Sequence, residues 1–338
     1  MQAMLAERLP NKTVRCLACS WRCALKPGSS GICGVRRNRD GELELLVWSR
    51  PAALQIDPIE KKPLFHFLPG AKSLSIGTIG CNFNCDFCQN WQLSQASKQG
   101  GVASIVYERE LSPKEIVGQA RRQHIPVIAY TYNEPTIFFE YAHETAKLAA
   151  AAGIRNIWVS NGFFSREALK TARPYLHAMN IDLKAFSNEF YKKRCGARVE
   201  PVLENIKAVH AAGIWLEITT LIIPGENDSE QELGQIARFI AAISPDIPWH
   251  ITAFHPDYKL LDKPATPASI LARGRKLGLG AGLRYVYTGN VWDTEGATTS
   301  CPGCGAVLIE RGWHEVSHNR LKDGTCPDCG AAIAGVWK

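Results

Sequence analysis

The sequence lacks any long apolar segment. Its 338 residues contain no low-complexity tract and no apolar run of the roughly 18 residues that a membrane helix needs, and the opening stretch MQAMLAERLPNK has no apolar signal-peptide core. These absences argue against a membrane or secreted protein, so we expect a cytoplasmic one. Charged residues make up 21% and hydrophobic residues 46% of the chain, which excludes disordered, collagen-like and coiled-coil proteins.

The chain also lacks a large excess of charge of one sign. The chain carries 39 Lys and Arg against 32 Asp and Glu, a formal net charge of +7. This small excess fits an anionic substrate without requiring one, and the basic residues are spread along the chain, so we do not expect nucleic-acid binding. The length corresponds to about two domains, or to one barrel with appendages.

Cysteine, in contrast, is abundant. Twelve cysteines in a reducing compartment indicate metal sites rather than disulfides. Along the chain they fall into the groups Cys16, Cys19, Cys23 and Cys33; Cys81, Cys85 and Cys88; Cys195 alone; and Cys301, Cys304, Cys326 and Cys329. Four thiolates complete a tetrahedral site, whereas three leave a coordination position open. The middle group is therefore the candidate catalytic centre.

Short β-branched runs alternate with helical patterns between about residues 73 and 290. The expected strands are 74–79, 127–131, 156–160, 179–183, 216–223, 250–254 and 284–287. Capping boxes begin helices at Ser112 and Ser229, and left-handed C-caps are expected at Gly153 and Gly213. The pattern predicts an α/β fold, a partial (β/α)6 TIM-like barrel with active residues at the strand ends.

The segments that flank the barrel differ from it in composition. We predict an N-terminal cysteine-rich module over 1–70 with a hairpin near Asp40-Gly41, the barrel over 71–297, and a zinc-ribbon-like knuckle over 298–338. Two C-P-x-C-G motifs in the last part have zinc-ribbon or rubredoxin-like spacing, which indicates structural zinc, with a redox iron as the alternative. The N-terminal cysteines have the spacing C-x2-C-x3-C-x9-C, which is compatible with zinc, with a second iron–sulfur cluster or with unligated cysteines.

The segment GCNFNCDFCQN (residues 80–90) directly follows the first barrel strand. Its C-x3-C-x2-C spacing lets three thiolates bind three irons of a [4Fe-4S] cluster and leaves the fourth iron open, whereas zinc loops use pairs of C-x2-C. The loop resembles the signature of the radical S-adenosylmethionine (SAM) superfamily. This resemblance implies that SAM binds the open iron and is cleaved reductively, giving a 5′-deoxyadenosyl radical that abstracts hydrogen from a substrate.

Other strand ends resemble the activating-enzyme branch of that superfamily. Residues 132–135 (YNEP) stand where such enzymes carry GGEP, and residues 160–163 (SNGF) and 182–184 (DLK) are similar to their TNGF and DLK patterns. Taken alone, the glutamate could be a surface charge at a helix start, and the DLK pair a structural ion pair. The resemblance implies cofactor contacts from Asn133, Glu134, Ser160, Asn161, Asp182, Lys184 and His255, with the aspartate also near a monovalent cation.

Two further residues are interpreted individually. His250 stands at the start of a predicted strand and is interpreted as a core histidine. Cys195 follows the DLK segment closely and is a candidate catalytic residue, although most lone thiols are inert.

Residues 57–70 (DPIEKKPLFHFLPG), together with the LSIGT segment and the cluster loop, resemble the radical enzyme of the AmmeMemoRadiSam system, over nearly the whole chain. The resemblance implies Memo-type and AMMECR-type partners and a reductant such as flavodoxin or ferredoxin. We therefore expect an oxidoreductase-type radical SAM enzyme with an unidentified substrate. The alternatives are a glycyl-radical enzyme activating enzyme and, in another class, a zinc-ribbon nucleic-acid-binding protein.

Overall fold

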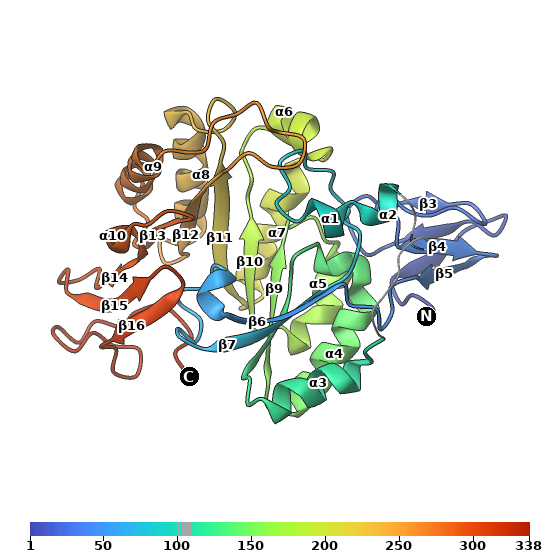
Figure 1. The fold of residues 1–338 in the computed structure, drawn as a ribbon, viewed down its shortest axis with the longest axis horizontal. Helices are drawn as coiled ribbons and strands as arrows, with labels where there is room; N and C mark the ends of the chain where they lie inside the picture. The colour runs from blue at the N-terminus through green and yellow to red at the C-terminus, as the bar shows by residue number, and fades with distance from the viewer. Residues whose placement is uncertain (100–101, 103–109) are drawn as a thin grey trace.

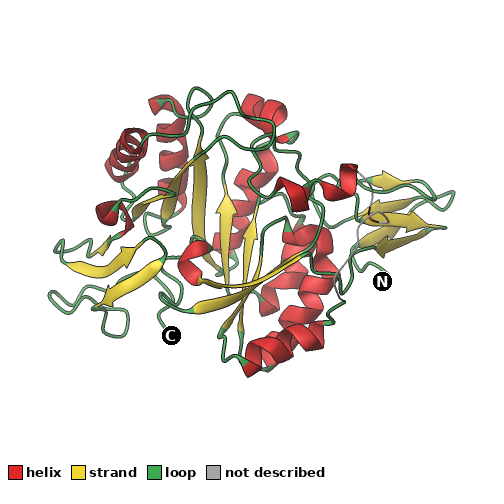
Figure 2. Cartoon of the chain, in the orientation of Figure 1, coloured by secondary structure: helices red, strands yellow, loops and turns green. Residues whose placement is uncertain are grey.

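The computed structural model describes residues 1–99, 102 and 110–338. Its centre is a mostly parallel sheet with the strand order β13-β12-β11-β10-β9-β8-β7-β6. Strands β7 to β13 run parallel to their neighbours, while β6 is antiparallel to β7. Helices cover the outside of the curved sheet, and the N-terminal and C-terminal parts lie at its two ends (Figures 1 and 2). The predicted α/β, barrel-like architecture is confirmed.

The strands of the main sheet match the sequence pattern closely. They are β6 (Ala53–Pro58), β7 (Lys72–Gly77), β8 (Val127–Tyr130), β9 (Arg155–Ser160), β10 (Ala178–Asp182), β11 (Trp215–Ile222), β12 (Trp249–Ala253) and β13 (Val286–Gly289). The seven parallel strands are those predicted, each within two residues at either end. Strand β6 was not predicted, because it lies at an edge and mixes exposed with buried positions. It lies within residues 1–70 but pairs with the barrel.

The helices follow the predicted start and stop signals with one exception. They are α1 (Trp91–Ser94), α2 (Ala96–Gln99), α3 (Pro113–Arg122), α4 (Phe139–Ala151), α5 (Arg166–Ala172), α6 (Asn188–Phe190), α7 (Glu200–Ala211), α8 (Glu230–Ile243), α9 (Ala268–Gly280), α10 (Thr294–Ala297), the 3-10 turns η1 (Ile59–Lys61), η3 (Pro135–Phe138) and η4 (Arg173–Tyr175), and the π-helix η5 (Tyr191–Cys195). Ser112 begins α3 with a complete capping box. Ser229 caps α8, but Glu232 does not return its carboxylate to the cap, because it accepts from the backbone of Phe186 and Ser187 instead.

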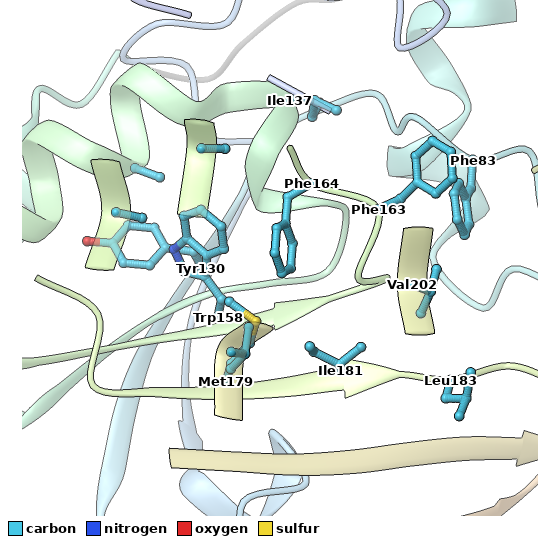
Figure 3. Close-up of a cluster of buried hydrophobic side chains, with 14 of the residues drawn as sticks. Phe83, Tyr130, Ile137, Trp158, Phe163, Phe164, Met179, Ile181, Leu183 and Val202 are labelled. Carbon is cyan, nitrogen blue, oxygen red and sulfur yellow. The ribbon is translucent and has the colours of Figure 1, made fainter. Parts of the chain in front are cut away.

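Side chains of the parallel strands alternate between two buried layers. Trp158 and Met179 face the helices, where Figure 3 shows them packed with Tyr130 and Ile181. Their neighbours on the other face pack against residues 59–67, which lie on the inner side of the open barrel. The glycines Gly153 and Gly213 end α4 and α7 with φ of +75° and +73°, as predicted. In the described part of the chain, no helix has the length and apolar character needed to span a membrane.

The N-terminal cysteine-rich module consists of two small sheets. They are formed by β1 (Ala6–Arg8), β2 (Val14–Cys16) and β3 (Ala24–Leu25), and by β4 (Arg36–Arg39) and β5 (Glu42–Leu45). The second pair is the predicted hairpin, turning at Asp40 and Gly41 with positive φ. The Arg36 guanidinium donates to both carboxylate oxygens of Glu140 on α4 at 2.7 and 2.9 Å, and both side chains are fully buried. This ion pair fastens the module to the barrel.

The C-terminal ribbon packs against the opposite end of the barrel. Its strands are β14 (Thr299–Ser300), β15 (Val307–Gly312) and β16 (Glu315–Asn319). Buried Arg311 on β15 lies over the ring of Phe65 at 4.2 Å and donates to its carbonyl at 2.7 Å, and Val336 bridges to Phe67. The ribbon therefore contacts residues 59–68, and it also packs against β13 and α10.

We predict that Glu140→Ala lowers the free energy of unfolding by about 3–5 kcal/mol, because it leaves the buried Arg36 guanidinium without its counter-charge. The exposed pair Arg22–Glu167 offers a matched control, since Glu167→Ala should lower it by at most about 1 kcal/mol. Anaerobic urea unfolding of both variants measures this. Equal losses in the two variants would contradict the assignment of the Arg36–Glu140 pair as the fastening contact.

Candidate active site

A cavity of about 390 Å³ lies at the carboxyl ends of the parallel strands. The predicted residues that line it are Cys81, Cys85, Cys88, Asn133, Glu134, Ser160, Asn161, Asp182 and Lys184. His255 is not among the lining residues; its side chain is exposed after β12, with Nδ1 3.4 Å from the Pro256 carbonyl oxygen. The structure thus brings together all the predicted cofactor residues except this histidine.

The three cysteines of the cluster loop are held in a largely buried environment. The backbone N–H of Phe83 donates to Cys81 Sγ at 3.5 Å, and Cys88 Sγ lies 3.2 Å from the Ser94 hydroxyl. Burial raises the pKa of the Cys81 thiol to about 12 and also raises that of Cys88. A thiolate in such surroundings is stable only beside a positive group, so this loop is suited to binding a metal centre.

The spacing of these thiols fits a cluster rather than one ion. Among the described residues, the only set of three or more potential ligand atoms lying within 4.8 Å of one another belongs to the C-terminal ribbon. The thiols of residues 81, 85 and 88 are more widely spaced, as expected when each binds a different iron of a [4Fe-4S] cluster. The residues present therefore fit that group, with the cavity beside it.

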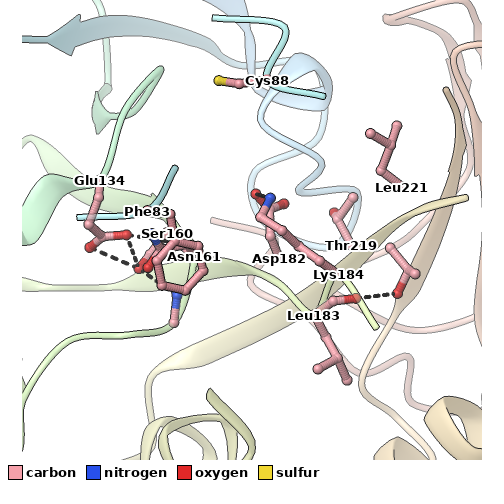
Figure 4. Close-up of polar contacts among 12 residues, drawn as sticks. Phe83, Cys88, Glu134, Ser160, Asn161, Asp182, Leu183, Lys184, Thr219 and Leu221 are labelled. Atoms are coloured by element: carbon pink, nitrogen blue, oxygen red, sulfur yellow. Dashed lines mark hydrogen bonds and ion pairs between the residues drawn. The ribbon is translucent and has the colours of Figure 1, made fainter. Parts of the chain in front are cut away.

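Glu134 joins the ends of two neighbouring strands. Its buried carboxylate accepts from the Ser160 hydroxyl at 2.9 Å and from the Asn161 N–H at 2.8 Å (Figure 4). It also accepts from the Thr136 N–H at 3.1 Å. Burial raises the pKa of Glu134 even though these donors act in the opposite direction. Its contacts are with the protein's own donors, so Glu134 fixes the turn after β9; a direct contact with SAM stays a prediction.

Tyr132 adopts the backbone conformation that a glycine of the GGEP pattern would otherwise supply. Its φ is +70°, in the left-handed region that glycine normally supplies. The conformation is held by the hydroxyl, which donates to Asp57 Oδ2 at 3.0 Å, and by Lys62, whose ammonium lies 4.9 Å from the ring centre. The backbone can therefore follow a glycine-like turn without glycine.

Two asparagines clamp the cluster loop. Asn133 donates to the Gly80 carbonyl at 2.8 Å, and Asn161 donates to Asn82 Oδ1 at 2.7 Å. Both side chains line the cavity, but their amide groups also connect the loop to the ends of β8 and β9. The two asparagines therefore position the cluster loop and its thiols, independently of any contact with a cofactor.

Asp182 and Lys184 face the cavity together, as the period of two along a strand predicts (Figure 4). The Lys184 ammonium lies 3.1 Å from Asp182 Oδ2. Burial opposes the charge of Lys184, but Asp182 and the neighbouring thiols raise its pKa well above the usual value. The site thus contains a stable ammonium, which suits an anionic group such as a carboxylate.

Several lining residues were missed by the sequence reasoning. They are Lys61, Lys62, Thr131, Thr219, Thr252 and Asn290. Thr219 on β11 pairs in register with Asp182, so the inward positions of β11 and β12 could have been found by extending the period of two from the DLK segment. The two lysines come from the turn after β6, and no periodicity marks them.

The two remaining residues do not line the cavity. Cys195 is fully buried beneath the cluster loop, where its thiol contacts that of Cys85 and its carbonyl accepts from Asn84 N at 2.9 Å. His250 is also buried, with Nε2 2.6 Å from Glu217 Oε2, so the core interpretation is confirmed.

Comparison with known proteins places this site in a family. Residues 75–240 match the family model for the Radical SAM superfamily. The chain therefore contains a radical SAM superfamily domain. The chain is also 45% identical over 311 residues to the uncharacterized protein MJ0808 of Methanocaldococcus jannaschii, a match that covers 92% of this chain and 91% of that protein. The predicted radical SAM superfamily domain is confirmed, and it implies an enzyme with a [4Fe-4S] cluster and SAM.

More distant radical SAM relatives agree over shorter spans. The isethionate sulfite-lyase activating enzyme of Desulfovibrio desulfuricans is 28% identical over 124 residues, 36% of this chain and 39% of that enzyme. A radical SAM methyltransferase from Sphaerobacter thermophilus shares the fold with a TM-score of 0.50 and 15% identity, over 67% of this chain and 68% of that one. The predicted similarity to activating enzymes is confirmed.

We predict that Glu134→Gln lowers the free energy of unfolding by about 1–3 kcal/mol, because the amide nitrogen cannot accept and leaves a buried donor unpaired. Exchange of the Asn161 backbone amide should become faster at the same time. The exposed residue Glu204 on α7 provides the control substitution Glu204→Gln. Denaturant unfolding combined with hydrogen exchange measures both effects, and an unchanged Asn161 exchange rate would contradict the assigned role.

Proposed function

We propose that this chain is an oxidoreductase-type radical SAM enzyme of the AmmeMemoRadiSam kind. It holds a [4Fe-4S] cluster at Cys81, Cys85 and Cys88 and binds SAM in the cavity beside them. The observation that carries the proposal is that three widely spaced thiols and the polar strand ends open onto one cavity. When bound, the cluster supplies the electron for reductive cleavage of SAM, giving methionine and a 5′-deoxyadenosyl radical that abstracts hydrogen from an unidentified substrate.

The chain's own residues bind and orient SAM in this proposal. Lys184 carries the positive charge for the methionine carboxylate, and Asp182 supports the ammonium group of that lysine or a monovalent cation beside it. Glu134 and Asn133 keep the loops in place. His255 reaches SAM only if the loop after β12 folds inward, because its side chain is exposed in this structure.

A second cavity of about 180 Å³ supports a route for the substrate. It shares Lys61, Pro63, Thr252 and Asn290 with the SAM cavity and lies between the barrel and the C-terminal ribbon. Its wall includes two exposed tryptophans, Trp292 and Trp313, whose rings stack with centres 6.3 Å apart. The substrate, or the partner that presents it, enters here; Memo-type and AMMECR-type proteins are the proposed partners.

The C-terminal thiols are proposed to bind structural zinc. Cys301 Sγ lies 3.6 Å from Cys329 Sγ, and Cys304 Sγ lies 3.7 Å from Cys326 Sγ. A tetrahedral Zn²⁺ with Zn–S bonds of about 2.3 Å needs sulfurs about 3.8 Å apart, so the observed spacing suits one zinc ion. We also propose that the enzyme works in the cytoplasm, with flavodoxin or ferredoxin as reductant.

Activation of a glycyl-radical enzyme is the second candidate function. It is supported by the 28% identity to the isethionate sulfite-lyase activating enzyme, although that match covers only 36% of this chain. In that case the hydrogen would come from a backbone glycine of a partner protein. A zinc-ribbon nucleic-acid-binding protein would leave the radical SAM cavity without a role.

We predict that replacing Cys81, Cys85 and Cys88 together by alanine abolishes 5′-deoxyadenosine formation, because no cluster can then deliver an electron to SAM. The assay is anaerobic reconstitution with iron, sulfide, dithionite and SAM, followed by chromatography of the nucleoside products. Glu204→Gln, an exposed substitution on α7, is the control. Wild-type levels of 5′-deoxyadenosine from the triple variant would refute the proposed function.

The substrate route has its own test. We expect the double variant Trp292→Ala and Trp313→Ala to keep the basal cleavage of SAM, since neither side chain lines that cavity. It should lose the stimulation of cleavage by the cell extract that contains substrate or partner. Extract titrations of wild-type and variant enzyme measure this, and equal stimulation of both would contradict a route past the tryptophans.

A further inference from the structure

The four N-terminal cysteines surround a cavity of their own. Its lining contains the side chains of Cys16, Cys19, Cys23 and Cys33, together with Arg36 and Asn82. The enclosed space is about 20 Å³, more than the roughly 10–15 Å³ that a single water molecule needs. Four cysteines therefore border one small cavity together with a buried arginine and a buried asparagine.

The spacing of these four sulfurs differs from that of a single-ion site. Within the described ranges, no three of them lie within 4.8 Å of one another, whereas the four sulfurs of the C-terminal ribbon do. The three sulfurs of the cluster loop, residues 81, 85 and 88, form no such close set either. The N-terminal thiols therefore share this wider spacing with the cluster loop and differ in it from the C-terminal ribbon.

Two buried N–H donors belong to residues that line the same cavity. Within the described part of the chain, Arg36 Nε and Asn82 Nδ2 have no hydrogen-bond acceptor, although these residues are 1% exposed. The other nitrogens of Arg36 are engaged by Glu140, and the Asn82 side-chain oxygen accepts from Asn161. Unpaired buried donors are rare, and donors beside thiolates commonly serve the sulfur atoms of an iron–sulfur cluster.

We propose that Cys16, Cys19, Cys23 and Cys33 hold a second iron–sulfur cluster, and that Arg36 and Asn82 donate hydrogen bonds to its sulfur atoms. Four thiolates satisfy the cluster fully, so it has no open iron for SAM. Zinc, the other metal compatible with the sequence, would need the four sulfurs at the close spacing that is found in the C-terminal ribbon.

The position of this site gives the second cluster a function. Asn82 lines the N-terminal cavity, and Cys81, the residue before it, lines the SAM cavity, so the two sites share one loop. Trp21 Nε1 donates to the Asn82 carbonyl at 2.8 Å and closes the contact. The N-terminal cluster is placed to pass one electron to the SAM-cleaving cluster. A low-potential protein reductant first reduces the N-terminal cluster by one electron. In the second transfer, the N-terminal cluster is oxidised by one electron and the SAM-cleaving cluster is reduced by one. This relay rests on the proposed function.

Metal analysis of the triple variant Cys81→Ala, Cys85→Ala and Cys88→Ala tests the assignment without disturbing the N-terminal module. After anaerobic reconstitution, we expect the variant to retain about two or four irons per chain, according to the cluster type, together with equal sulfide and one zinc. The electron paramagnetic resonance spectrum of its reduced form should not respond to SAM. An iron-free variant with two zinc ions per chain would overturn the proposal.

A second measurement addresses the donors and the relay. Arg36→Lys keeps the charge but removes Nε from its position, so it should shift the midpoint potential of the iron signal that the triple variant retains. In an otherwise wild-type background, Cys33→Ser should lower the ratio of flavodoxin-driven to dithionite-driven SAM cleavage several-fold. An unchanged potential would overturn the donor assignment, and an unchanged ratio would overturn the relay.

These experiments distinguish a failure of the second-cluster proposal from a failure of the proposed function. If the wild-type enzyme fails to cleave SAM with dithionite, the proposed function fails, yet the iron content of the triple variant still decides whether the N-terminal cluster exists. If cleavage is normal and the triple variant is iron-free, only the second cluster is refuted.

Discussion

The buried carboxylate of Glu134 is the constraint on which the rest of the site depends. A carboxylate taken out of water is unfavourable unless donors surround it, and here the donors come from the ends of two strands. Satisfying that one group therefore fixes the turn after β9 relative to β8. Because Asn161 from the same turn holds Asn82 in the cluster loop, the position of the thiols follows from it.

The same chain of contacts continues into the N-terminal module. The Cys33 carbonyl accepts from the Ser97 hydroxyl at 2.9 Å, next to the cluster loop. A Cβ on Gly80 would lie 2.7 Å from that carbonyl, so the close approach of loop and module requires glycine there. With the Arg36–Glu140 pair on the other side, the module is held from both sides. Its thiols are thus held at a set position relative to the SAM cavity rather than on a free appendage.

Local patterns account for what the sequence could predict. The seven parallel strands were found because buried strands are continuous β-branched runs, and the DLK pair was placed because alternation along a strand is a property of the backbone. Edge strand β6 and the lysines after it were missed, since their positions depend on pairing and burial between distant segments. Glu232 shows the same limit: the capping motif was present, but a neighbouring loop offered its carboxylate two other donors.

Residues 57–68 connect the C-terminal ribbon to the SAM cavity, because they contact both. At one end of this segment, Lys61 and Lys62 line the cavity and pair with Asp57 at 2.9 and 2.7 Å. At the other, the backbone N–H groups of Phe65 and His66 donate to buried Glu217 at 2.9 and 2.8 Å. Arg311 of the ribbon packs on the same phenylalanine. A metal that stabilises the ribbon therefore also stabilises the segment that forms one wall of the cavity. In this way a four-thiol site outside the cavity can contribute to the geometry of the active site without contacting SAM.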